Sequence, residues 1–237
     1  MLVDIVIPAY NPGEYLHECL ISCVSQSYEN FNIIVVDDNS TEDVERVVSN
    51  FSEVSYIRNP KNLGPGASRN VGINNGSGDL ISFIDSDDIM HQDKLALSVE
   101  RLSKSSEAGM CCGNYRIMVN RQSIRPPFYK LPIDINYNLL MKQNFVASGS
   151  TTVRRSVIDE VGSFNEDYWI AEDYDLWLRI SERYPVEYIH NVLYYYSIVP
   201  GEGSLTQRSD IQKDHIKNIN EIRRSSKERV RDRGRNP

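Results

Sequence analysis

The sequence of 237 residues contains no apolar run near the roughly 20 residues that a membrane-spanning helix needs. Its first residues lack the basic segment and apolar core of a secretory signal, so we expect a cytoplasmic protein. Cysteine is also scarce. The four cysteines follow neither the spacing of a zinc site nor that of a disulfide framework, and we interpret them as small buried side chains.

An excess of positive charge is missing too. The formal net charge of −7 argues against a general nucleic-acid-binding protein. The charge is unevenly distributed, because residues 211–237 carry a net +5 and leave −12 on residues 1–210. We expect this basic tail to form a solvated helix that frays, and peripheral contact with the inner face of an anionic membrane is the alternative. The sequence indicates no oligomeric state.

The first 85 residues alternate between strand patterns and helical patterns. Runs of β-branched residues predict the strands, and apolar residues at helical spacing predict the helices. We expect strands at 4–8, 32–36, 54–58 and 80–84, with helices at 16–24, 44–51 and 67–75. This order predicts an α/β fold with a Rossmann-like, mostly parallel central sheet and helices on both faces.

Polar segments follow three of these strands: Pro8-Ala9-Tyr10-Asn11, Asp37-Asp38-Asn39 and Asp85-Ser86-Asp87-Asp88. Ligands of parallel α/β sheets bind beyond the carboxyl ends of the strands. We therefore expect the three segments to meet along one edge of the sheet and to form a binding site.

The acidic segment after the fourth strand is the most distinctive of the three. On an extended backbone, Asp85 and Asp87 share a face while Asp88 points away. Paired carboxylates suit a hard divalent cation that also contacts a phosphorylated ligand. The alternative is helix capping with a solvated acidic turn.

Residues 91–210 are less regular and predict a mixed second half. We expect a helix near 95–102, strands within 113–125, a loop or short helix over the site at 126–144, and a strand at 148–154. A short helix to 161, a helix at 172–184 and strands near 188–189 and 193–198 follow.

Six segments together resemble the inverting glycosyltransferases of family 2, which have a single-domain GT-A fold. They occur in the order and spacing of the family: IVIPAYN (5–11), VVDDNSTED (35–43), NLGPGASRNVG (62–72), ISFIDSDD (81–88), SGSTTVRR (148–155) with VGSFNE (161–166), and AEDYDLWLR (171–179). The resemblance implies a GT-A domain over residues 1–210. Its nucleotide-binding half is 1–90, its acceptor-binding half is 91–210, and the basic tail at 211–237 follows.

The resemblance also implies the residues that bind the donor. Pro8, Ala9 and Tyr10 form the first loop around the nucleoside, and Asp38 hydrogen-bonds the edge of the base. A carboxylate acceptor suits the imide N–H of uracil, which indicates a UDP-sugar. Arg69 reaches the nucleotide or its phosphates, although an ordinary surface ion pair is the alternative for this residue.

Asp85-Ser86-Asp87 matches the DXD motif of the family. The resemblance implies that Asp87 coordinates Mn²⁺ or Mg²⁺, while Asp85 contacts the ribose or a metal-bound water. The cation would stabilise the charge that develops on the nucleoside diphosphate as it leaves. Oxygen ligands suit either ion.

The ED motif of the family falls at Glu172-Asp173. Inversion at the sugar carbon needs a base for the acceptor hydroxyl, and the resemblance assigns this role to Asp173, with Glu172 and Trp177 in support. An aspartate with a pKa near 3.9 is a weak base for an alcohol, so the hydroxyl must lie within hydrogen-bond reach. The alternative is that both acids simply favour the dipole at the start of a helix.

The sequence departs from the family in one segment. Many members have a histidine after the late strand, in a segment like YRxHxGS. Residues 196–204 are comparable here, with Val199 near the histidine position, and none of the four histidines matches it. Glu202 or water substitutes for this ligand, or the diphosphate is held differently.

The function predicted from the sequence is an inverting, metal-dependent hexosyl transfer to a glycan or lipid-linked acceptor, as in polysaccharide biosynthesis. One alternative is a nucleotide-sugar-binding module without turnover, against which the presence of both Asp87 and Asp173 argues. A second is a sugar-phosphate nucleotidyltransferase, whose glycine-rich loop is missing after the first strand. A phosphatase with an aspartate nucleophile also has a DxD sequence but expects Thr or Val two residues later. No pattern indicates which sugar or acceptor is used.

Overall fold

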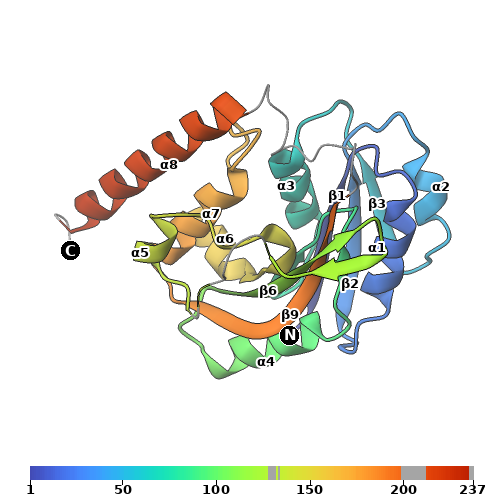
Figure 1. The fold of residues 1–237 in the computed structure, drawn as a ribbon, viewed down its shortest axis with the longest axis horizontal. Coiled ribbons are helices and arrows are strands. Elements are labelled where there is room, and N and C mark those ends of the chain that lie inside the picture. The colour runs from blue at the N-terminus through green and yellow to red at the C-terminus, as the bar shows by residue number, and fades with distance from the viewer. Residues whose placement is uncertain (128–131, 133, 199–211, 235–237) are drawn as a thin grey trace.

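The computed structural model describes residues 1–127, 132, 134–198 and 212–234. Within these residues the centre is a nine-stranded sheet, and its first part is parallel (Figure 1). The strands of this part lie in the order β3 (Val54–Arg58), β2 (Phe31–Asp37), β1 (Val3–Ala9) and β4 (Leu80–Phe83). The predicted alternation of strands and helices is therefore confirmed over this half of the chain.

The second part of the sheet is mixed. β8 (Thr152–Arg154) pairs antiparallel with β4 and joins the parallel strands to the later ones. β6 (Met110–Val119) follows and is parallel to β9 (Val186–Ile198), while β5 (Ile89–Met90) lies antiparallel at the edge. β7 (Ser123–Arg125) forms a hairpin with β6. The prediction of a mixed second half is confirmed.

Helices cover both faces of the sheet, as the alternation of side chains along a strand requires. Val3, Ile5 and Ile7 of β1 belong to one apolar core, and Val6 belongs to the other. The first core includes α1 (Tyr15–Val24), α2 (Val44–Val48) and α4 (Lys94–Lys104). The second includes α3 (Pro65–Asn75), α6 (Arg155–Val161) and α7 (Glu172–Ser181).

Two late segments differ from the sequence expectation. The strand expected at 148–154 begins as a 3-10 turn, η1 (Ser148–Ser150), and only β8 pairs in the sheet. The two strands expected near the end form the single strand β9, whose register against β6 shifts part-way. Such an irregularity interrupts the alternation of the sequence and makes one strand resemble two. The segment 126–144 lies partly outside the described residues and contains α5 (Tyr137–Leu140).

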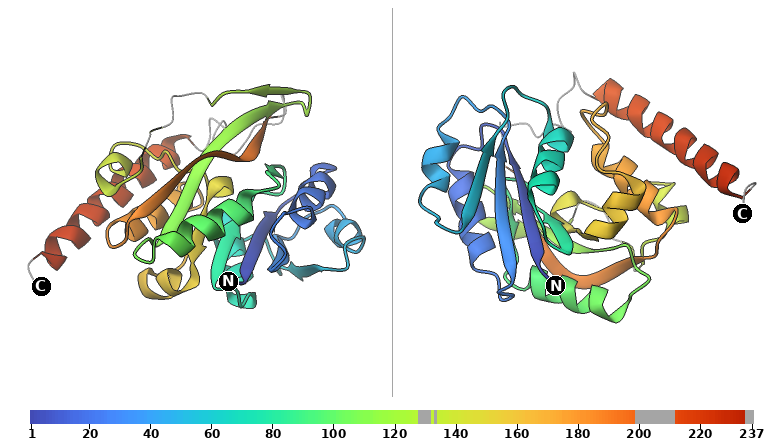
Figure 2. Two further views of the ribbon diagram at one scale, coloured as in Figure 1. Left: turned by 90° about the horizontal axis from the view of Figure 1, so that it is seen from below. Right: turned by 180° about the vertical axis from the view of Figure 1, so that it is seen from behind.

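The basic tail forms α8 (Gln212–Arg233), which packs against α7 at the periphery of the molecule (Figures 1 and 2). Ile222 and Ser226 are fully buried, and Arg229 pairs with Glu182 just after α7 at 2.7 Å. The helix expected in the tail is thus present, but it is docked rather than only solvated. None of the helices described combines the length and apolarity needed to cross a bilayer.

Gly72 of α3 lies directly against Val6 of β1. A Cβ at position 72 would lie 2.4 Å from Cγ1 of Val6. Gly72→Ala gains about 1 kcal/mol of helix propensity but forces overlapping groups apart, which typically costs about 1–3 kcal/mol. We expect a net loss of about 1 kcal/mol in the free energy of unfolding, measured by denaturant titration.

Val6→Ala provides the control, because it removes the methyl group that the new Cβ meets. The Gly72→Ala/Val6→Ala variant should lose less stability than the sum of the two single variants. Additive losses would show that this contact is not the cause.

Candidate active site

The three polar strand ends meet at one edge of the sheet. β2, β1 and β4 are neighbours and run parallel, so their carboxyl ends lie side by side. The N–H of Asp38 donates to the carbonyl of Ala9 at 2.7 Å, which joins the first two loops. Pro8 and Ala9 are buried, whereas the Tyr10 side chain is exposed at this edge.

The buried carboxylate of Asp38 fixes the loop that leads into α3. It accepts hydrogen bonds from Nδ2 of Asn59 and from the N–H groups of Leu63 and Gly64, each at 2.8 Å. Gly64 has φ +90°, a conformation that favours glycine, so the carboxylate holds a tight turn. Asp38 lies at the predicted edge, and its contact with a nucleotide base stays a prediction.

Asp37, next to Asp38 in the sequence, has a structural role. The fully buried carboxylate accepts hydrogen bonds from the N–H of Ser40 and the hydroxyl of Tyr56, both at 2.8 Å, and pairs with Arg58. Burial opposes ionisation, but these donors outweigh it and lower the pKa of Asp37. Asp37 therefore fastens β3 to β2.

Arg69 of α3 joins the two sides of the site. Its guanidinium donates to Oδ1 of Asp85 and to Oε1 of Glu172, both at 2.6 Å, and lies 5.4 Å from the ring centre of Phe164. Burial alone would lower the pKa of Arg69, but the two carboxylates raise it above its ordinary value. The alternative of a surface ion pair is wrong, because Arg69 is 3% exposed.

The acidic segment turns as soon as β4 ends. The N–H of Asp88 donates to the carbonyl of Asp85 at 3.0 Å, so the extended backbone assumed for the alternation of Asp85 and Asp87 is absent, and that argument is wrong. Asp88 points inward: it accepts a hydrogen bond from the N–H of Ser197 at 2.8 Å, and burial raises its pKa. Ser86 is buried within the turn, while Asp87 is exposed.

Two cations hold this turn, and sequence analysis missed both. Lys94 is fully buried and donates to the carbonyl of Phe83 at 2.7 Å, and burial lowers its pKa to about 8. Arg121, in the turn between β6 and β7, donates to the carbonyl of Asp87 at 2.8 Å. The two contacts are made to backbone carbonyls 11 and 34 positions away, so no side-chain motif identifies them.

The other side of the site is the start of α7. Ala171 precedes the helix at φ +67°, which turns the chain sharply into Glu172-Asp173. Asp173 is half-buried, and its Oδ2 accepts a hydrogen bond from Oγ of Ser148 at 3.2 Å. Ser148 lies in η1, at the start of the SGSTTVRR segment, so two of the family-like segments meet at the predicted base.

Burial raises the pKa values of Glu172 and Asp173, and the positive charge of Arg69 opposes this shift at both residues. A raised pKa makes the carboxylate of Asp173 a stronger base than an ordinary aspartate. The direction of the shift favours proton uptake by Asp173, and the acceptor hydroxyl must still lie within hydrogen-bond reach.

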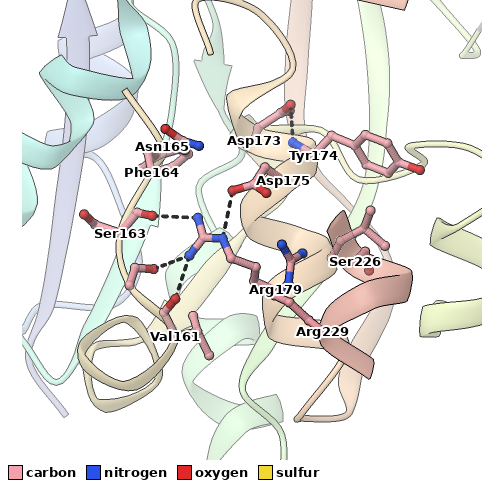
Figure 3. Close-up of polar contacts among 12 residues, drawn as sticks. Val161, Ser163, Phe164, Asn165, Asp173, Tyr174, Asp175, Arg179, Ser226 and Arg229 are labelled. Atoms are coloured by element: carbon pink, nitrogen blue, oxygen red, sulfur yellow. Dashed lines mark hydrogen bonds and ion pairs between the residues drawn. The ribbon is translucent and has the colours of Figure 1, made fainter. Parts of the chain in front are cut away.

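Two further residues of α7 support the site from within the protein. Trp177 is fully buried and packs against Phe83, so it lies in the core. Asp175 accepts a hydrogen bond from Arg179 at 2.8 Å, and Figure 3 shows this guanidinium turned toward the preceding loop. There Arg179 donates to the carbonyls of Val161, Gly162 and Ser163. This clamp fixes the segment that brings Phe164 against Arg69.

The acidic turn suits a cation that is shared with a ligand. The Asp85 side chain is 37% exposed and Asp87 is exposed, so both carboxylates are accessible. Mg²⁺ commonly takes one or two carboxylates and completes its shell with water and substrate phosphates. Over the described part of the chain, no three His, Cys, Asp or Glu side chains form a cluster that could hold a metal. Val199 and Glu202, at the predicted late metal contact, lie outside the described residues.

Replacing Arg69 with methionine should leave the buried carboxylate of Glu172 without its counter-charge. We expect a loss of about 3–5 kcal/mol in the free energy of unfolding at neutral or higher pH. The pKa of Glu172 is higher in the folded state than in the unfolded state. As the pH falls, Glu172 of the folded variant is therefore protonated before Glu172 of the unfolded variant. The loss should therefore shrink from about pH 8 to about pH 5, measured by denaturant titrations across this range.

Arg69→Met/Glu172→Gln is the matched control, because it removes both charges. This variant should recover most of the lost stability and most of the pH dependence. Equal, pH-independent losses in the two variants would mean that packing rather than charge accounts for the effect.

The chain is similar in sequence to known proteins. The family model described as Glycosyl transferase family 2 matches residues 4–162. An uncharacterized glycosyltransferase of Rickettsia felis is 31% identical over 200 residues, which cover 81% of this chain and 33% of the relative. The UDP-Glc:alpha-D-GlcNAc-diphosphoundecaprenol beta-1,3-glucosyltransferase WfgD of Escherichia coli is 32% identical over 181 residues, with coverages of 76% and 69%. This chain thus spans about a third of the first relative and about two thirds of the second.

Two solved structures share the fold. TarS of S. aureus in complex with UDP-GlcNAc has a TM-score of 0.72 at 21% identity, over 85% of this chain and 60% of that chain. The mannosyltransferase PcManGT of Pyrobaculum calidifontis, in complex with GDP-Man and Mn²⁺, has a TM-score of 0.68 at 20% identity, with coverages of 85% and 58%. The chain therefore belongs to glycosyl transferase family 2 and has the GT-A fold.

Proposed function

We propose that this chain transfers a sugar from a UDP-sugar to a hydroxyl group of a glycan or lipid-linked acceptor, with inversion at the sugar carbon and with a divalent cation. The observation that carries the proposal is the double contact of Arg69 with Asp85 and Glu172. One buried guanidinium connects the acidic turn to the neighbour of Asp173. The leaving group and the base would thus act within one continuous polar site.

Several contacts support a UDP-sugar as the donor. A carboxylate offers about four acceptor positions, and Asp38 uses three of them within the protein. The remaining position suits the imide N–H of uracil, with Pro8, Ala9 and Tyr10 on the adjoining loop. WfgD carries UDP-Glc in its name and TarS is complexed with UDP-GlcNAc, whereas the PcManGT complex contains GDP-Man.

Asp87, assisted by Asp85, would hold Mn²⁺ or Mg²⁺ at the exposed end of the acidic turn, with Ser86 between them. When bound, the cation supplies charge stabilisation for the departing diphosphate. Arg121 fixes the carbonyl of Asp87, so the turn presents the carboxylate on a held backbone. The positive charge of Arg69 suits phosphate oxygens on the same side of the site.

Asp173 would act as the general base. As the acceptor oxygen bonds to the sugar carbon, its proton passes to Asp173, and the bond from that carbon to the diphosphate breaks on the opposite side. Ser148 orients Oδ2 of Asp173, and the raised pKa favours proton uptake. A lipid-linked acceptor is supported by WfgD, whose name contains GlcNAc-diphosphoundecaprenol.

Asp173→Asn tests the base. We expect sugar transfer to fall by about 10²–10⁴-fold, because the amide cannot take the proton, while UDP and metal binding persist. UDP release and product formation measure the rate, and calorimetry measures binding. Asp167→Asn, an exposed position just before α7, is the control and should keep wild-type turnover. Wild-type transfer by Asp173→Asn would remove this residue from the base role.

Asp87→Asn tests the metal contact in a screen of nucleotide sugars for UDP release with Mn²⁺ or Mg²⁺. We expect a UDP-sugar to be used by the wild type, and both metal-stimulated release and metal-dependent UDP binding to be lost in the variant. Asp159→Asn, an exposed residue of α6, makes the same chemical change away from the site. Unchanged metal stimulation in Asp87→Asn would contradict the metal contact. Failure to bind any UDP-sugar in the whole panel would contradict the donor assignment.

A further inference from the structure

α8 carries a narrow line of cations along its outer face. At ~100° per residue, five positions fall within about 40° of a common line parallel to the helix axis. All five are exposed, and they are Lys213, Lys217, Arg224, Lys227 and Arg231. We call them the cationic stripe. The buried residues Ile222 and Ser226 lie on the opposite side of the helix, against α7, so packing on α7 turns the stripe toward solvent.

The residues beside the stripe differ between its two flanks. On one flank lie the exposed acids Asp214, Glu221, Glu228 and Asp232. On the other flank lie two exposed hydrophobic residues, Ile216 and Val230, with 62% and 38% of their surface accessible to solvent. A helix that presents a line of cations next to exposed apolar side chains has the pattern of a helix that lies on a membrane surface.

We propose that the cationic stripe rests on an anionic membrane surface. From residue 213 to residue 231 the stripe is about 27 Å long and nearly straight, which suits a flat surface. Lysine and arginine side chains reach anionic headgroups, and Ile216 and Val230 enter the apolar boundary beside them.

The position of α8 favours a surface over a soluble polyanion. Residues 1–210 carry −12, so a flexible polyanion that wraps the body is repelled. α8 lies at the edge of the molecule and its C-terminal end projects away from the sheet (Figures 1 and 2). A membrane can therefore contact the stripe while much of the acidic body stays beyond a Debye length of about 8–10 Å.

The biological role of this membrane contact rests on the proposed function, whereas the contact itself can be tested without sugar transfer. Nδ2 of Asn218 donates to the carbonyl of Ile170 at 3.0 Å, and Arg223 donates to the hydroxyl of Tyr174 at 3.0 Å. α8 is thereby bound to the segment that positions Asp173. A membrane-bound α8 places the acceptor half of the site beside lipid-linked acceptors.

The test is flotation of the full chain with vesicles of equimolar phosphatidylglycerol and phosphatidylcholine, compared with pure phosphatidylcholine. We expect binding to the anionic vesicles that is lost as salt is raised to about 0.5 M. Lys217→Gln/Arg224→Gln/Lys227→Gln keeps helix propensity, and at about 5-fold per charge it should weaken binding roughly 100-fold. Glu221→Gln/Glu228→Gln should strengthen binding.

Arg46→Gln/Arg101→Gln/Lys104→Gln is the matched control, because it removes three exposed cations from α2 and α4. It should bind vesicles like the wild type. Equal weakening by the control and by the stripe variant would contradict the assignment to α8, as would absent binding of the wild type. Binding to heparin without binding to vesicles would also contradict it. UDP binding should be unchanged in the stripe variant, so failure of the membrane contact is distinguishable from failure of the proposed function.

Discussion

The buried guanidinium of Arg69 is the group on which the arrangement of this site depends. It ties the carboxyl end of β4, through Asp85, to the start of α7, through Glu172, which lies 103 positions after Arg69 in the sequence. A buried ion is stable only when its counter-charges are in place, so each partner requires the others. The acidic turn and the start of α7 are consequently held at a fixed separation before any ligand binds. Preorganised charge of this kind is what stabilises a leaving group at low cost in reorganisation.

The same rule sorts the other acids at this edge. The carboxylate of Asp37 accepts hydrogen bonds from Ser40 and Tyr56 and pairs with Arg58. The carboxylate of Asp88 accepts a hydrogen bond from the backbone of β9. These two carboxylates stabilise the packing of strands and loops inside the protein. Asp85, Asp87 and Asp173 keep partly or fully exposed side chains at this edge, and the buried Asp38 keeps one acceptor position for the proposed contact with the base. Exposure of the side chain, rather than residue type, therefore separates Asp37 and Asp88 from the candidates for metal binding and proton transfer.

Local sequence patterns predict some of these features, whereas contacts between distant segments determine the others. The alternation of strands and helices up to β4 is a local property, and β-branched runs and helical spacing predicted it. The insertion of β8 between β4 and β6 is a long-range pairing that no local pattern contains. Within the site, motifs indicated Asp87 and Asp173 as candidates, but the inward turn of Asp88 depends on Ser197, which is distant in sequence. Lys94 was not predicted, because the burial of a lysine at the start of a helix depends on the core that surrounds it.

The predicted nucleotide half, acceptor half and tail belong to one folded body. β8 is hydrogen-bonded to β4 and to β6, so the sheet is continuous across the boundary between the halves. The second apolar core contains Val6 of β1, Trp177 of α7 and Ile222 of α8 together. Loss of any of these parts would expose apolar surface of the others. Because α8 shares this core, its packing on α7 holds the basic tail against the helix that carries the proposed base.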